Sequence, residues 1–214
     1  MTLEFDSVAA AVAEVRATPQ RRPVRVDPGR RLDRDGFHAF CAAHPEVQAE
    51  LLPDGTLELM SPQTMKSNRA ESRVFYYLMD WFMRGGGVYG EVFGPSMGYT
   101  LPDGSVRSPD ASWVGHERLA GLAEGEQDRM PRLVPDFVIE VMSKTDELKR
   151  AKAKMSDTWM ANGVRLGWLL RPSVQQVLIY RAGATEPEIV KGFDGALSAD
   201  EVVPGFSLDL TLLR

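Results

Sequence analysis

Cysteine and histidine are scarce in this sequence of 214 residues. Cys41 is the only cysteine, and the histidines are His38, His44 and His116. A single cysteine excludes a disulfide bond within the chain, which fits a reducing compartment. The histidines do not have the paired spacing of a zinc site. Zinc chemistry with cysteine and histidine ligands is therefore not expected.

Long apolar runs and nucleotide-binding loops are also missing. The longest apolar runs, such as Leu166–Leu170, fall far short of the roughly 20 residues that cross a bilayer. The N-terminal segment has no basic start and carries Glu4, Asp6 and Glu14, which makes a poor secretory signal. No GxGxxG or Walker loop follows a predicted strand, and there is no nucleophile elbow. We expect a cytoplasmic protein that does not associate with membranes.

Positive charge is in deficit. The chain has 25 lysines and arginines against 30 acidic residues, a net charge of −5. Its overall field therefore does not attract nucleic acid, and local basic stretches would have to do so. Two such stretches exist, at 21–31 and at 144–154. A solvated surface is the simpler interpretation of each, and contact with phosphates is the alternative.

Composition and patterning describe an ordinary globular α/β protein. Hydrophobic residues make up 43% of the chain and charged residues 26%, as is usual for soluble domains. Without repeats or an evident linker, we predict an N-terminal helix and connector over residues 1–29 and one domain over residues 30–214. Periodicity and turn signals predict the following elements. Helices are expected at 7–17, 33–43, 66–84, 116–123 and 146–162, and strands at 47–52, 56–60, 88–93, 97–101, 109–114, 137–141, 166–170, 177–180 and 188–191.

Two carboxylates stand at strand positions. Asp110 opens a strand after Pro109, and Glu140 lies inside the apolar run Phe137–Val141, the best candidate for the centre of the sheet. A carboxylate in such a strand is costly unless a metal ion or a partner neutralises it. A metal site is one explanation for Glu140, and an ion pair with arginine or lysine at the end of the strand is the other.

The order strand, helix, strand over residues 137–170 predicts a parallel pair of strands. Four segments carry a resemblance: GYTLPDGSVRSPDASWV at 98–114, PDFVIEV at 135–141, NGVRLGWLL at 162–170 and PGFSL at 204–208. They resemble the Uma-type family, bacterial proteins with a PD-(D/E)XK restriction-endonuclease-like fold. The resemblance covers roughly residues 30 to 212 and implies a central mixed β-sheet flanked by helices.

The resemblance implies a role for each of four residues. Asp110 and Glu140 correspond to two acidic metal ligands, and Val141 would offer its backbone carbonyl to the same ion. Glu71 resembles a helical glutamate that completes the site directly or through water, although a solvated helix acid is an equally good interpretation. The implied cofactor is Mg²⁺ or Mn²⁺.

The resemblance also implies a lysine supplied by the helix after Glu140, because Met142 stands where the short motif would place one. The candidates are Lys149, Lys152 and Lys154. Helical geometry puts Lys152 and Lys154 on opposite flanks of the predicted buried stripe and Lys149 further out. The spacing from Glu140 favours Lys154, with Lys152 as the alternative. The segment after Lys154 is one residue longer than is usual in the family.

These residue types fit metal-dependent hydrolysis of a phosphodiester. A hard cation held by oxygen ligands polarises the phosphoryl oxygen, and a lysine orients the attacking water. The resemblance therefore implies an endonuclease acting on nucleic acid, with DNA preferred over RNA, as a homodimer that matches the two-fold symmetry of a duplex. A non-catalytic dimeric binding or scaffold protein on the same fold, which the acidic charge favours, is the main alternative. Hydrolysis of another phosphoester is a third.

Overall fold

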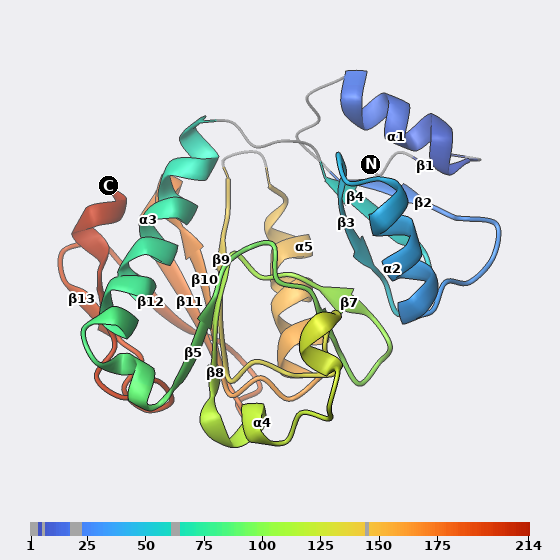
Figure 1. Ribbon diagram of the computed structural model, residues 1–214. Helices are drawn as coiled ribbons and strands as arrows, with labels where there is room; N and C mark the ends of the chain where they lie inside the picture. Colours follow the sequence, from blue (N-terminus) through green and yellow to red (C-terminus); the bar gives the residue numbers. More distant parts are fainter. Residues whose placement is uncertain (1–3, 6, 18–22, 61–64, 144–145) are drawn as a thin grey trace. The chain divides into compact units, whose positions relative to one another are not determined.

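The computed structural model describes residues 4–5, 7–17, 23–60, 65–143 and 146–214 (Figure 1). The chain divides into two compact units, each assembled from separate stretches of sequence. Unit 1 comprises residues 1–63, 98–108 and 122–133, and unit 2 comprises residues 64–97, 109–121 and 134–214. The domain boundary at residue 30 stays a prediction, since compactness does not show which segments fold independently.

Unit 1 is built on a six-stranded sheet in the order β1-β2-β4-β3-β7-β6. The strands predicted at 47–52 and 56–60 form a hairpin around Pro53–Gly55. Strands β3 and β4 are antiparallel, and Gly55 has a φ of 84°. The elements of unit 1 are β1 (Glu4–Phe5), α1 (Val8–Ala17), β2 (Val24–Val26), α2 (Arg34–Ala43), β3 (Gln48–Leu51), β4 (Leu57–Met60), β6 (Tyr99–Thr100), β7 (Val106–Arg107) and η2 (Glu126–Asp128).

One expectation for unit 1 is wrong. Residues 18–29 were predicted to be a connector, yet β2 lies within them and pairs antiparallel with β4. Val24 and Val26 are buried while Arg25 between them is exposed, so β2 has the alternation of a half-buried strand. Three residues are too few for that period to stand out from their arginine- and proline-rich surroundings. Residues 18–22 lie outside the described part of the chain.

Unit 2 carries a second six-stranded sheet, in the order β12-β11-β10-β9-β8-β5. Helix α3 lies along one side of this sheet and α5 along the other (Figure 1). Its larger elements are α3 (Met65–Met83), β5 (Gly90–Phe93), β8 (Ala111–Gly115), α4 (His116–Ala120), β9 (Phe137–Val141), α5 (Leu148–Ala153), η3 (Lys154–Met160), β10 (Leu166–Arg171), β11 (Gln176–Arg181) and β12 (Glu188–Lys191). Its short elements are η1 (Gly86–Val88), η4 (Pro172–Val174), β13 (Ala196–Ser198), β14 (Ser207–Asp209) and η5 (Leu210–Leu213).

The sheet of unit 2 is mixed, as the sequence predicts. Strands β9 and β10 are parallel, whereas β8 and β9 are antiparallel. The apolar strand β9 lies between β8 and β10, inside the sheet. A mixed sheet flanked by helices confirms the predicted fold class, and the parallel pair confirms the strand–helix–strand interpretation.

The register between β8 and β9 positions the two predicted carboxylates. Ala111 pairs with Ile139 and Ser112 with Val138. Continuing this register by one residue places Asp110 directly across from Glu140. Because side chains alternate between the faces of a sheet, these two lie on the face opposite Ala111 and Ile139. The face that carries Ala111 and Ile139 belongs to the apolar core of unit 2, together with Val74 and Leu78 of α3.

The helix expected over 146–162 differs from the prediction in its second half. Residues Leu148–Ala153 form an α-helix, but Lys154–Met160 form the π-helix η3. Two backbone bonds span five residues, from Ala161 N to Ser156 O at 3.0 Å and from Val164 N to Trp159 O at 3.1 Å. The pattern of apolar residues in the sequence does not reveal this wider turn, because the turn shifts the spacing of the buried residues by only one position.

Candidate active site

Asp110 joins the start of β8 to the end of β9. Its Oδ2 accepts a hydrogen bond of 2.6 Å from the backbone N–H of Val141. Burial raises the pKa of Asp110 well above its ordinary value, and the charges of Glu140 and Glu71 raise it further. Lys154 and the Val141 N–H act in the opposite direction, but they do not cancel the rise. The charges of two carboxylates and one lysine therefore act on the buried Asp110.

Glu140 is held by two donors from η3. Its Oε1 lies 2.8 Å from the ammonium of Lys154 and accepts a hydrogen bond of 2.8 Å from the indole N–H of Trp159. The side chain of Glu140 is 12% exposed and that of Lys154 is 20% exposed. The ion pair that offered one explanation for Glu140 is thus present, and its cation is the lysine that the family resemblance favours.

The backbone of Val141 faces Asp110. Met142 N donates to Leu170 O on β10, whereas Val141 N donates to Asp110. In an extended strand the N–H and C=O of one residue point to the same side, so the carbonyl of Val141 is also directed to the side of Asp110. This agrees with the orientation that a metal-ligating carbonyl would need.

Glu71 is buried on α3, with 7% of its surface exposed. The interpretation as a solvated helix acid is therefore wrong. Its charge acts on Asp110, which places it in the same electrostatic environment. In the part of the chain that the structure describes, no three acidic, histidine or cysteine side chains gather closely enough to hold a metal ion together.

The helix lysines differ in position. Lys154 reaches Glu140, whereas Lys149 and Lys152 are exposed on α5. The structure thus brings Lys154, and not Lys152, into the group of Asp110 and Glu140. All five side chains, those of Glu71, Asp110, Glu140, Lys154 and Trp159, belong to unit 2.

Trp159 is the residue that sequence reasoning did not place in the site. Its apolar position in the helix was predicted, and it is fully buried. Its hydrogen bond to Glu140 was not foreseen. The available signal was chemical, because a buried tryptophan usually directs its N–H to an acceptor. The sequence does not show which acceptor that is.

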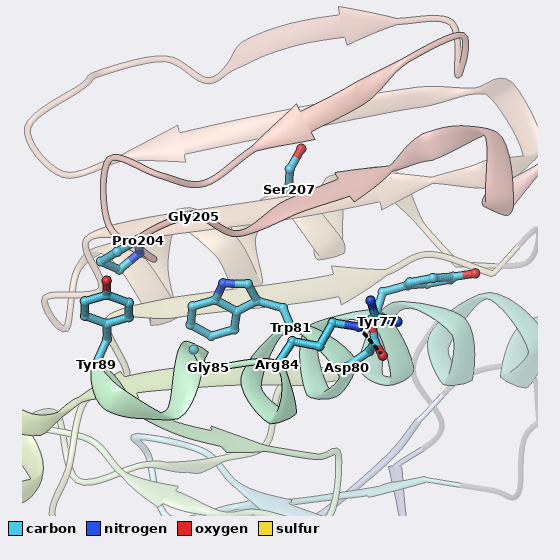
Figure 2. A pocket seen from close by; sticks show the side chains of 10 residues that line it. Tyr77, Asp80, Trp81, Arg84, Gly85, Tyr89, Pro204, Gly205 and Ser207 are labelled. Carbon is cyan, nitrogen blue, oxygen red and sulfur yellow. Dashed lines mark hydrogen bonds and ion pairs between the residues drawn. The ribbon is translucent and has the colours of Figure 1, made fainter.

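A surface hollow elsewhere on unit 2 is lined by none of the predicted metal-binding or catalytic residues. It has a volume of about 470 Å³ and lies between the C-terminal part of α3 and the loop before β14 (Figure 2). Trp81 and Tyr89 supply aromatic walls, and Asp80 is paired with Arg84 at 2.9 Å. Asp80 is the acidic residue in the lining of this hollow, and its carboxylate is paired with a guanidinium group. The hollow therefore differs from the surroundings of Asp110, where carboxylates lie near one another.

Comparisons with known proteins agree with this architecture. A solved structure described as "a putative nuclease belonging to DUF820 from Anabaena variabilis ATCC 29413" superposes with a TM-score of 0.65, covering 85% of this chain and 97% of its own at 19% identity. That likeness shows a shared fold. A search of curated proteins found no match. No helix among the described residues is long and apolar enough to cross a membrane.

A family model extends the comparison to sequence. The model described as "Uma2: Putative restriction endonuclease" matches residues 34–211, which is most of the chain. The four motifs that carry the resemblance lie within this range and include Asp110 and Glu140, and Lys154 also lies within the matched residues. The chain therefore belongs to the Uma2 family, as those motifs predict.

Proposed function

We propose that this protein is a metal-dependent endonuclease that hydrolyses phosphodiester bonds of DNA. The observation that carries the proposal is the juxtaposition of Asp110, Glu140 and Lys154 at the adjoining ends of β8 and β9. Membership of the family described as "Putative restriction endonuclease" supports this reaction class. Two acids and a lysine are the residue types that phosphodiester hydrolysis with a divalent cation requires.

Asp110, Glu140 and the carbonyl of Val141 would hold Mg²⁺ or Mn²⁺, with Glu71 contributing through water. All of these are oxygen donors, and Mg²⁺ is usually held by one or two carboxylates while it keeps several waters. The raised pKa of Asp110 supports the assignment, because a divalent cation would relieve the repulsion among these carboxylates. When bound, the cation would supply polarisation of the phosphoryl oxygen.

Lys154 would orient the attacking water and stabilise charge on the phosphate. Its ammonium is fixed 2.8 Å from Glu140, so its position relative to the carboxylates is set before substrate binds. Because an ammonium carries three N–H donors, one lysine can contact a carboxylate, a water and a phosphate oxygen together. Pre-organised donors of this kind stabilise a developing negative charge without reorganisation.

Local charge supports nucleic acid as the substrate despite the acidic chain. Lys149, Arg150 and Lys152 are exposed on α5, directly before Lys154. A phosphate backbone responds to such local clusters more strongly than to net charge. A homodimer would present two such sites to a two-fold duplex, and this assembly is part of the proposal.

A second candidate is a non-catalytic binding or scaffold protein. The observation that favours it is the pairing of Glu140 with both Lys154 and Trp159, which also suits a purely structural carboxylate. The net charge of −5 points the same way.

Cleavage of mixed DNA and RNA with Mg²⁺ or Mn²⁺ distinguishes the two candidates. We expect the wild type to cut DNA, and Asp110→Asn or Glu140→Gln to lower the rate about 10³-fold or more, since a metal supplies several kcal/mol to the transition state. Lys154→Ala should lose cleavage yet keep the rise in melting temperature that Mn²⁺ produces.

Lys152→Ala is the matched control for Lys154→Ala and should cut at nearly the wild-type rate. Cleavage that persists in Asp110→Asn would point to a contaminating nuclease. Binding of nucleic acid without cleavage, in either metal, would favour the scaffold candidate. Activity on a small phosphodiester but on neither nucleic acid would assign a different substrate.

A further inference from the structure

The π-helix η3 brings two residues of the site onto one face. Lys154 and Trp159 are five positions apart, and in an α-helix at about 100° per residue such side chains diverge by about 140°. In a π-helix, residues i and i+5 are joined by a backbone hydrogen bond, and the wider turn brings their side chains closer in direction than an α-helix does. The widened turn therefore allows Lys154 and Trp159 to point in the same direction.

Both side chains meet at one oxygen of Glu140. The Nζ of Lys154 and the Nε1 of Trp159 each lie 2.8 Å from Oε1. The same Nζ is 5.8 Å from the centroid of the Trp159 ring, within the range of roughly 6 Å for a cation–π contact. Trp159 thus restrains the carboxylate through its N–H and the ammonium through its ring.

Two other buried tryptophans of unit 2 show that this arrangement is not a general requirement of the core. Trp113 and Trp168 are 4% and 0% exposed. Their indole nitrogens have no hydrogen-bond partner among the described residues. A tryptophan present only for its volume can therefore remain unpaired in this core. Trp159, in contrast, donates to a carboxylate in the candidate active site.

We propose that Trp159 is a positioning residue for Glu140 and Lys154, and that η3 is the structural device that puts it in place. With Oε1 held by two donors, the orientation of the carboxylate is restrained, and Glu140 would present it to the cation in that orientation. The proposal rests on the function proposed above, and it assigns a site role to a residue outside the acid–lysine set.

The test compares Trp159→Phe with Trp168→Phe. Each substitution removes an indole N–H from a fully buried ring and leaves an aromatic ring behind, but only the first removes a bond to Glu140. Affinity for Mn²⁺ is measured by calorimetry, and kcat and KM are measured on duplex DNA. We expect Trp159→Phe to weaken Mn²⁺ binding about 10- to 100-fold, as is typical when a partner of a metal ligand is lost, and to lower kcat with little change in KM. Trp168→Phe should match the wild type in both.

A spectroscopic readout accompanies the binding data. In ¹⁵N-labelled protein, the indole N–H signal that disappears in Trp159→Phe should shift during titration of the wild type with Mg²⁺, and the Trp168 signal should shift much less. A wild type that binds neither metal would overturn the proposed function, and the role of Trp159 with it. A wild type that binds metal, with Trp159→Phe equal to it in affinity and kcat, would overturn the positioning role alone.

Discussion

Each unit of the molecule contains a largely buried cluster of charged side chains, and the two clusters are balanced differently. In unit 1, Arg107 lies 3.1 Å from Glu50 and 3.8 Å from Glu58, and all three residues are at most 5% exposed. Arg25 approaches Glu58 from the outside at 3.7 Å. Two carboxylates thus face two guanidinium groups. A backbone N–H from Ser108 also donates to Glu50 at 3.0 Å.

In the cluster of unit 2, Asp110 interacts with two carboxylates, Glu140 and Glu71, and with the ammonium of Lys154. Burial first, and then the two glutamates, raise the pKa of Asp110 against the opposing effect of the lysine. The comparison teaches that buried charge alone does not identify a functional site. The fold alone explains a cluster whose carboxylates face guanidinium groups, whereas a buried carboxylate with a strongly raised pKa is a candidate for a functional site. The divalent cation of the proposed function would explain such a carboxylate in unit 2.

The sharpest way to break this comparison is to remove one charge from each cluster. Arg107→Met removes the buried arginine beside Glu50 and leaves Glu58 with the half-exposed Arg25, and it should lower the free energy of unfolding by about 3–5 kcal/mol. Asp110→Asn removes a repelled charge but keeps an oxygen for the Val141 N–H, so it should leave stability unchanged or raise it by roughly 0.5–2 kcal/mol. Urea unfolding without metal measures both.

Arg25→Met is the control for Arg107→Met. Its side chain is 48% exposed, so the loss should be no more than about 1 kcal/mol. If Arg107→Met fails to fold, the same variant carrying Glu50→Gln should recover stability, since it restores the balance. A large loss of stability in Asp110→Asn would mean that the cluster of unit 2 is structural as well.

Stability as a function of pH sharpens the comparison further. Burial and the neighbouring carboxylates raise the folded-state pKa of Asp110, while an aspartate in the unfolded chain has a pKa of about 3.9. Between these values the folded state binds the extra proton, so the stabilising contribution is complete below about pH 3.9 and is lost as the pH rises through the folded pKa. Unfolding of the metal-free protein should show this decline.

Asp110→Asn is the control for the pH series and should remove that part of the decline. Saturating Mn²⁺ should remove it as well, because metal binding requires the deprotonated carboxylate. Identical pH profiles for wild type and variant would show that Asp110 does not titrate abnormally.

The smallest effect is expected from deletion of Asp157, an exposed residue within η3. Removing one residue turns the spacing from Lys154 to Trp159 into four, which an ordinary α-helix places on one face. Metal affinity and kcat should therefore stay within a few-fold of the wild type. Insertion of one alanine after Asp157 is the matched control and should abolish cleavage. Loss of metal binding on deletion would show that the π-helical winding itself is needed.

Much of the fold could be predicted from the sequence, for definite reasons. An apolar stripe predicts the long helix α3, and its members Val74 and Leu78 are fully buried in the structure. The apolar run Phe137–Val141 predicts a central strand, and β9 does lie inside the sheet. Both signals are local, because burial of one face imposes a period on consecutive residues. The motif around Asp110 added the family, which the family model confirms over residues 34–211.

The choice among the helix lysines shows where local patterns stop being informative. Regular α-helical geometry placed Lys152 and Lys154 on opposite flanks of the buried stripe, so it could not separate them. The π-helix begins at Lys154, and a π turn holds more residues than an α turn. Positions after Lys154 therefore do not follow the α-helical period.

The sequence by itself determined the order of the main helices and strands, the family, and the pairing of Asp110 with Glu140 as the candidate carboxylates. Only the tertiary structure decided the assembly of two units from interleaved segments, the strand at Val24–Val26, and the part played by Trp159. The physical reason is the range of the interactions. Periodicity reports whether a residue is buried, but the partner of a buried polar atom is chosen by elements distant in sequence, and that choice exists only once they pack.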